Sequence, residues 1–100
     1  MPQEVTPEQF GELVENGVVL LDFFSPNCGP CRMLNPVLEQ LENVTVLKID
    51  AAQHPEFAAQ YGVSAVPTLK FFKDAELKDT MIGLQSKDKL QSKIDELFGG

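Results

Sequence analysis

The sequence predicts an α/β fold in which a mixed β-sheet carries helices on both of its faces. Short apolar runs alternate along the chain with segments of helical periodicity, as is typical of parallel strands joined by crossover helices. Near the C-terminus, two strand-like runs are separated by only a tight turn, which predicts an antiparallel hairpin at one edge. A length of 100 residues predicts a single domain, residues 1–100.

A short strand is expected first, followed by a helix in the stretch TPEQFGELVENG. Thr6 is the predicted N-cap, Pro7 takes the first helical position, and Gln9 completes a capping box. Gly17 is the predicted end of this helix. The apolar residues expected on its inner face are Phe10, Leu13 and Val14. Residues 18–24, VVLLDFF, lack alternation and therefore predict a strand covered on both faces.

The second predicted helix begins near Cys28 and extends to about Glu42. The apolar residues expected on its inner side, at spacings of three and four, are Met33, Leu34, Val37, Leu38 and Leu41. Residues 44–50 predict another strand, and residues 55–62 a short helix ending at glycine. The hairpin comprises TLKFFK and LKDTMIG. The last helix begins at Ser86, and its apolar residues are Leu90, Ile94, Leu97 and Phe98.

Charge and hydropathy exclude several classes of function. Eight Lys and Arg residues against fifteen Asp and Glu residues give a net charge of −7, which argues against nucleic-acid binding. The longest apolar run is too short to span a membrane. The N-terminal stretch MPQEVTPEQF has neither a basic start nor an apolar core, so we expect no secretory signal and a cytoplasmic location.

Cys28 and Cys31 are the only cysteines of the chain. A zinc site needs three or four protein ligands, and the one histidine, His54, lies far along the sequence beside Pro55, where a solvated loop residue is expected. We therefore expect no metal. A purely structural disulfide would close a very short loop and gain little chain entropy. Redox or nucleophilic chemistry remains.

The spacing of the two cysteines at a helix start favours disulfide exchange. Side chains at i and i+3 are neighbours there, and the free N–H groups of the first turn favour a thiolate. Arg32 adds a nearby cation, Pro30 enters the helix without losing a donor, and Gly29 keeps the approach to sulfur open. Cys28, outside the first turn, is the predicted nucleophile, and Cys31, one turn inside, the predicted resolving thiol.

Several stretches in order resemble the thioredoxin family: VVLLDFF, NCGPCRMLNPVLEQL, VTVLKID, YGVSAVPTLKFFK, and the glycine of MIGLQSK. The resemblance implies a thioredoxin-like three-layer sandwich with a mixed central sheet flanked by four helices. It also implies reduction of protein disulfides through a redox-active Cys28–Cys31 disulfide, with no bound cofactor. The implied partners are disulfide-containing proteins and an NADPH-dependent thioredoxin reductase, and we expect a monomer.

Asp22 interrupts an apolar strand between two leucines and two phenylalanines. An exposed strand end is one interpretation, but these neighbours favour burial, which would raise the pKa of its carboxyl group and make it a proton acceptor. The resemblance implies that Asp22 lies beneath the disulfide and accepts the proton of Cys31. It also implies that Lys48 is the charge partner of Asp22, although alone Lys48 would be interpreted as a solvated strand-end lysine.

The resemblance also implies a substrate-binding surface. Pro67 alone would be expected in the commoner trans form, whereas the VPT match implies a cis bond beside the cysteines. Val66 would then offer its backbone to a substrate strand. The other residues expected to contact substrate are Gly29, Pro30, Ala65, Ile82, Gly83 and Leu84. Taken alone, Ile82 and Leu84 are equally consistent with ordinary sheet residues.

Three positions depart from the family pattern. Asn27 stands where tryptophan usually precedes the first cysteine, and we expect it to cap the helix and to expose more of Cys28. Phe24 replaces an aromatic residue that is often tryptophan. The hairpin turn has Ala75 where glycine is usual, so a positive φ there would be strained.

Two other functions remain open on the same fold. One is an oxidant or isomerase that uses the same thiol chemistry at a higher reduction potential. The other is a binding or scaffold subunit in which the two thiols have no role. The Gly-Pro pair between the cysteines resembles the reducing members of the family.

Overall fold

The computed structural model describes residues 1–99. Its elements are β1 (Gln3–Glu4), α1 (Pro7–Leu13), β2 (Val18–Phe24), α2 (Gly29–Leu38), β3 (Thr45–Asp50), α3 (Pro55–Gln60), β4 (Thr68–Lys73), β5 (Glu76–Ile82) and α4 (Lys87–Gly99). The strand order is β1-β3-β2-β4-β5. Strands β1, β3 and β2 run parallel, whereas β4 and β5 add an antiparallel edge, which confirms the predicted mixed sheet.

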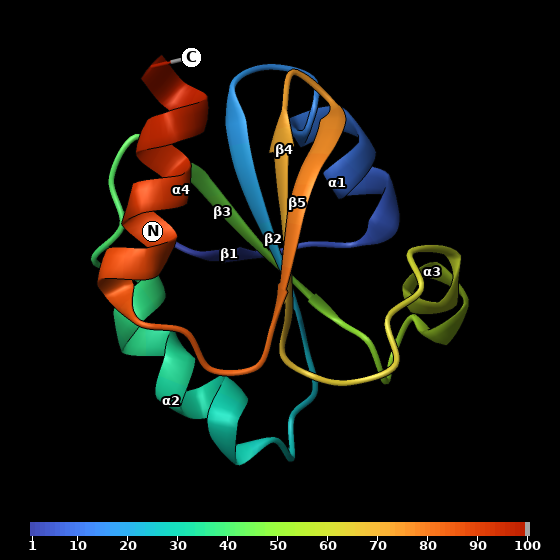
Figure 1. Ribbon diagram of the computed structural model, residues 1–100. Helices are drawn as coiled ribbons and strands as arrows, with labels where there is room; N and C mark the ends of the chain where they lie inside the picture. The colour runs from blue at the N-terminus through green and yellow to red at the C-terminus, as the bar shows by residue number, and fades with distance from the viewer. Residues whose placement is uncertain (100) are drawn as a thin grey trace.

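Helices cover both faces of this sheet, as Figure 1 shows. One core contains Phe10 of α1 and Ala58 of α3, and the other contains Leu34 of α2 and Ile94 of α4. The central strand β2 contributes to both cores because successive side chains point to opposite faces. The three-layer arrangement with four helices is therefore confirmed.

The first helix begins as its sequence predicts. Gln9 N–H donates to Thr6 Oγ1 (3.2 Å), and Thr6 N–H donates back to Gln9 Oε1 (2.9 Å), which completes the capping box. The helix ends at Leu13, however, so the prediction that Gly17 closes it is wrong. Gly17, with φ of 78°, lies in the turn before β2 instead. Leu13 is also not an inner residue, because it is 40% exposed.

Helix α2 is shorter than predicted, and its buried face excludes one residue that was expected on it, Met33. It ends at Leu38 rather than near Glu42, and Asn43 follows with a left-handed φ of 62°, which no helix can continue through. Met33 is 63% exposed, not on the inner side. Leu34 lies on the inner line with Leu38, and a helix rotates by about 100° per residue, which carries Met33 off that line.

The last helix and the hairpin also refine the predictions. Ser86 Oγ accepts a hydrogen bond from Lys89 N–H (3.2 Å) at the predicted start of α4, but Phe98 is 57% exposed rather than packed inside. In the β4–β5 turn, Asp74 and Ala75 both have positive φ, 49° and 74°, which confirms the strain expected at Ala75. Two hydrogen bonds fix this turn: Gly17 N–H donates to Asp74 Oδ1 (2.7 Å), and Asp74 N–H donates to the Gly17 carbonyl (3.0 Å).

Candidate active site

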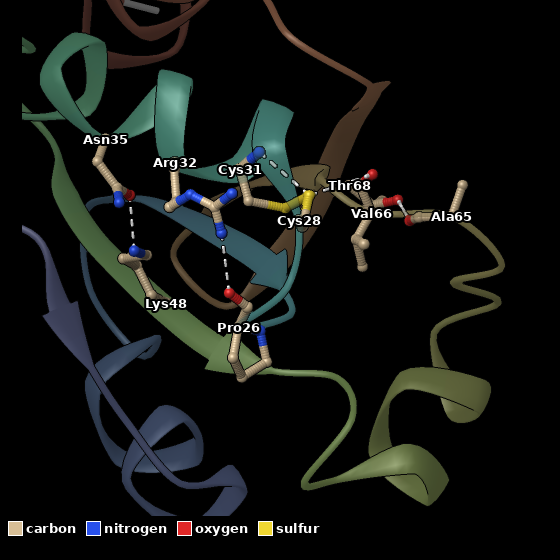
Figure 2. The surroundings of a disulfide bond; sticks show 9 residues. All are labelled: Pro26, Cys28, Cys31, Arg32, Asn35, Lys48, Ala65, Val66 and Thr68. Carbon is tan, nitrogen blue, oxygen red and sulfur yellow. Dashed lines mark hydrogen bonds between the residues drawn. A yellow bond between two sulfur atoms is a disulfide. The ribbon is translucent and has the colours of Figure 1, made fainter.

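Cys28 and Cys31 form a disulfide at the start of α2, with their Cα atoms 5.2 Å apart (Figure 2). Both residues are buried, Cys28 at 8% exposed and Cys31 at 3%. Cys31 N–H donates to Cys28 Sγ at 3.1 Å, so the first sulfur lies where a helix N-cap side chain accepts. The helix terminus therefore contacts Cys28 Sγ, the sulfur of the predicted nucleophile, through a backbone N–H.

The expectation that Asn27 caps the helix is wrong. Cys28 is the N-cap residue, with extended backbone angles and its own sulfur as the acceptor. Asn27 lies one residue earlier, exposed in the preceding turn. Cys28 itself is 8% exposed beside Asn27, and whether a tryptophan at position 27 would cover it further stays a prediction.

The first turn of α2 presents an open surface beside the disulfide. Gly29 and Pro30 occupy its first two positions, and Pro30 is exposed. A Cβ added at Gly29 would meet no protein atom within 4 Å, so the space beside it is free for a partner. Arg32 turns its guanidinium group to the preceding turn, where Nη1 donates to the Pro26 carbonyl (3.1 Å), as Figure 2 shows.

Asp22 is fully buried, which contradicts an exposed strand end. Strand alternation places its side chain on the face of Leu20, the face that α2 and α4 cover. Neither carboxyl oxygen has a hydrogen-bond partner among the described residues. Burial without such partners raises the pKa of Asp22 to about 7, and the charge of Lys48 lowers it to a smaller extent.

Lys48 lies directly opposite Asp22 in the register of β2 and β3, but its ammonium group contacts other residues. Lys48 Nζ donates to Asn35 Oδ1 at 2.6 Å (Figure 2) and lies 4.6 Å from the centre of the Phe24 ring. Within residues 1–99, no ion pair joins Lys48 to Asp22. Asn35 was not predicted as a site residue, although it lies one helical turn after Cys31, and this spacing places both residues on one face of the helix.

The loop before β4 reaches the disulfide from the other side. The Val66–Pro67 bond is cis, as the resemblance implied, and the Val66 carbonyl oxygen lies 3.8 Å from Cys28 Sγ. That contact is a packing contact, because a disulfide sulfur carries no hydrogen to donate. Gly83 N–H donates to the Pro67 carbonyl (2.8 Å), which fixes the end of β5 beside this loop.

Apolar surface surrounds these backbone groups. Ile82 is 63% exposed and Leu84 46%, so neither is an ordinary buried sheet residue. A shallow hollow of about 350 Å³ extends from Val66 toward α3 and is lined by Ala51, Ala52, Pro55, Ala58, Val63 and residues 64–66. Small side chains therefore line one side of the approach to the disulfide.

Residues 1–99 contain neither a cluster of candidate metal ligands nor a membrane-spanning helix. Across residues 1–99, no three His, Cys, Asp or Glu side chains are grouped so that they could hold a metal ion. His54 precedes α3, and its side chain makes no capping hydrogen bond there. In the same range, no helix has the length and apolar character needed to cross a membrane.

Known proteins match this chain in both sequence and structure. The profile of the Thioredoxin family matches residues 1–96. A thioredoxin of Chlamydia caviae is 45% identical, with 96% of this chain and 98% of that protein aligned. A thioredoxin of Bacillus subtilis is 39% identical, with 93% of this chain and 94% of that protein aligned.

Solved structures agree with the sequence matches. A mutant thioredoxin from Halobacterium salinarum superposes with a TM-score of 0.88 at 38% identity, covering 97% of this chain and 90% of that one. The thioredoxin of Malassezia sympodialis gives 0.83 at 32% identity, covering 96% and 92%. With a CxxC disulfide at the start of α2, the chain belongs to the thioredoxin family and is a thiol–disulfide oxidoreductase.

Proposed function

We propose that this protein reduces disulfide bonds in other proteins, with Cys28 as nucleophile and Cys31 as resolving thiol. The observation that carries the proposal is the position of Cys28 Sγ, which accepts the N–H of Cys31 at the helix terminus and lies beside the Val66 backbone. That position favours a thiolate and places it next to a surface that can hold an extended chain.

In the first step, the Cys28 thiolate of the reduced protein attacks one sulfur of a target disulfide. A Cys28–target disulfide forms, the target S–S bond breaks, and the other target sulfur leaves as a thiolate that takes a proton from solvent. The N–H groups at the start of α2 favour the attacking anion because they have no partner inside the helix.

In the second step, Cys31 resolves the mixed disulfide. Its thiol gives a proton to the Asp22 carboxylate, and the resulting thiolate attacks Cys28 Sγ. The Cys28–Cys31 disulfide forms, and the second target sulfur leaves as a thiolate. The two cysteines are oxidised by two electrons, and the target disulfide is reduced by two. A pKa of about 7 lets Asp22 take up and release this proton near neutral pH.

Substrate would bind along the loop before β4 in this proposal. The Val66 backbone pairs with an extended target segment. The hydrogen bond from Gly83 N–H to the Pro67 carbonyl keeps the loop that carries Val66 in place. Gly29 and Pro30 form one wall of the site, and Ala65, Ile82 and Leu84 form the apolar rim of the other. The hollow toward α3 takes small apolar side chains of the target.

Regeneration requires electrons from outside the chain. We expect an NADPH-dependent thioredoxin reductase to reduce the Cys28–Cys31 disulfide, since the thioredoxin family implies such a partner in general. The proposal includes a single-domain monomer that carries electrons in the cytoplasm. Its net charge of −7 suits protein partners rather than nucleic acid.

The test is reduction of insulin disulfides with dithiothreitol as electron donor. Cys28→Ser should abolish activity, whereas Cys31→Ser should trap the target as a mixed disulfide that mass spectrometry detects. A scaffold protein would keep its function when both cysteines are lost. A reduction potential in the range of oxidants, well above that of reducing thioredoxins, would indicate an oxidant or isomerase instead.

A further inference from the structure

We propose that Asn35 is a positioning residue that holds the Lys48 ammonium group away from Asp22 and so sets the pH at which Asp22 loses its proton. The kinetic consequence rests on the proposed role of Asp22 as proton acceptor for Cys31. The position of the ammonium group does not rest on it, because it is a property of the resting, oxidised protein.

Two contacts hold Lys48. Its Nζ donates to the amide oxygen of Asn35 on α2 at 2.6 Å, and Figure 2 shows the two side chains pointing toward one another across the gap between helix and strand. The same nitrogen lies 4.6 Å from the Phe24 ring, within the range of a cation–π interaction. Neither partner is Asp22, although Asp22 is the residue opposite Lys48 in the sheet.

The carboxyl group of Asp22 lies in largely apolar surroundings. Both of its carboxyl oxygens are buried and have no partner in the described part of the chain. The core on this side of the sheet contains apolar side chains of β2, β4 and α4: Val18, Leu20, Leu69, Phe71, Leu90 and Ile94. Lys73 of β4 and Asp79 of β5 also lie on this face by strand alternation, but they bond elsewhere: Lys73 Nζ donates to the Leu97 carbonyl (2.9 Å), and Asp79 pairs with Lys93 (3.4 Å). Helix α2, which contributes Leu34 and Leu38 to this core, also contains the buried Cys31. Strand β3 adds Lys48, whose charge lowers the pKa of Asp22 against the larger effect of burial.

Without the Asn35 side chain, the Lys48 ammonium group can bind another acceptor. Asn35 and Lys48 line a hollow of about 280 Å³ whose other residues include the carboxylates Glu4 and Glu39. Both glutamates are exposed, so water already solvates them and an ion pair with either gains little. Asp22 is buried, and attraction between charges is stronger in such a site. The freed ammonium group therefore moves toward Asp22.

The experiment measures Asp22 directly. In oxidised protein, the ¹³Cγ chemical shift of Asp22 is followed against pH by NMR. Asn35→Ala should move its inflection to lower pH by about 1 pH unit, the usual effect of an adjacent opposite charge on a carboxyl group. Lys48→Met should move it to higher pH. Asn35→Ala added to Lys48→Met should cause no further movement, because Asn35 acts through the ammonium group.

Gln40→Ala is the matched control. It removes an amide near the end of the same helix, one that donates to the Pro36 carbonyl (3.1 Å) and does not contact Lys48. This control should leave the inflection in place. An unmoved inflection in Asn35→Ala, a movement to higher pH, or an Asn35→Ala effect that persists without Lys48 would each overturn the proposal.

The pH profile of insulin reduction separates this proposal from the proposed function. If Asp22 accepts the proton of Cys31, the profile of Asn35→Ala moves to lower pH together with the NMR inflection. If the inflection moves and the profile does not, the positioning role of Asn35 stands and the proton-acceptor role of Asp22 fails.

Discussion

Replacing Asp22 by asparagine should stabilise the protein, by an amount that depends on pH. The folded state holds this carboxyl with a pKa of about 7, raised by burial, whereas an unfolded chain ionises it near pH ~3.9. Between these values the folded state binds more protons than the unfolded state. Stability therefore falls as pH rises through this window and levels off above it.

The size of the effect follows from the width of the window. The window spans about three pH units, and each unit lowers the free energy of unfolding by about 1.4 kcal/mol, so the parent protein loses about 4 kcal/mol of stability by pH 8. Asparagine is isosteric with the protonated carboxyl and stays neutral at every pH. The variant and the parent should thus have similar stability at pH 4.5, and the variant should be more stable at pH 8 by up to about 4 kcal/mol.

Guanidinium chloride melts of the oxidised protein at pH 4.5, 6, 7 and 8 test this expectation. The oxidised form is used so that the free thiols do not titrate. A gain in unfolding free energy that is the same at all four pH values would refute the reasoning, because only ionisation of Asp22 makes the gain grow with pH. Insulin reduction by the same variant should be slower, since Cys31 loses its proton acceptor. Unchanged turnover from pH 6 to 8 would remove Asp22 from the mechanism.

Three further predictions concern other parts of the chain. In the reduced protein near neutral pH, limiting iodoacetamide should modify Cys28 before Cys31, and peptide mass mapping that finds mainly Cys31 modified would reverse their roles. Ala75→Gly should stabilise the protein by about 1 kcal/mol in thermal melts, because φ of 74° is strained for alanine; an unchanged or lower melting temperature would contradict this. Asn27→Trp should raise activity with a thioredoxin reductase by adding a buried aromatic contact and should not raise it with a small aromatic disulfide. Equal rates for variant and parent toward both substrates would make position 27 a neutral surface site.

Where local chemistry decides the structure, the sequence predicted it closely. Strand β2 has the predicted bounds, Val18–Phe24, because a continuous apolar run is stable only when both faces are covered. The capping box at Thr6 and Gln9 formed because all of its groups lie within one helical turn. The Cys28–Cys31 pair was predicted for the same local reason, since residues i and i+3 at the start of a helix are neighbours.

Features that depend on distant contacts were not predictable in this way. A spacing of three and four residues placed Met33 and Leu34 on one face, although only packing against α4 and the sheet decides which of them is buried. Lys48 could be placed opposite Asp22 by strand order, but its long side chain has several acceptors within reach. Its choice of Asn35 depends on how α2 lies over β3, which the sequence does not specify.

The two cysteines receive different environments from one helix terminus, and this difference can divide their chemistry. Cys28 Sγ accepts an N–H at the N-terminal end of α2, where negative charge is favoured. Cys31 is one turn inside the helix and is only 3% exposed. A thiol in such surroundings keeps its proton until a base removes it. We therefore propose that the carboxyl group whose burial lowers the stability of the fold near neutral pH is also the group that releases the second cysteine, and that the Lys48–Asn35 contact sets the pH at which it does so.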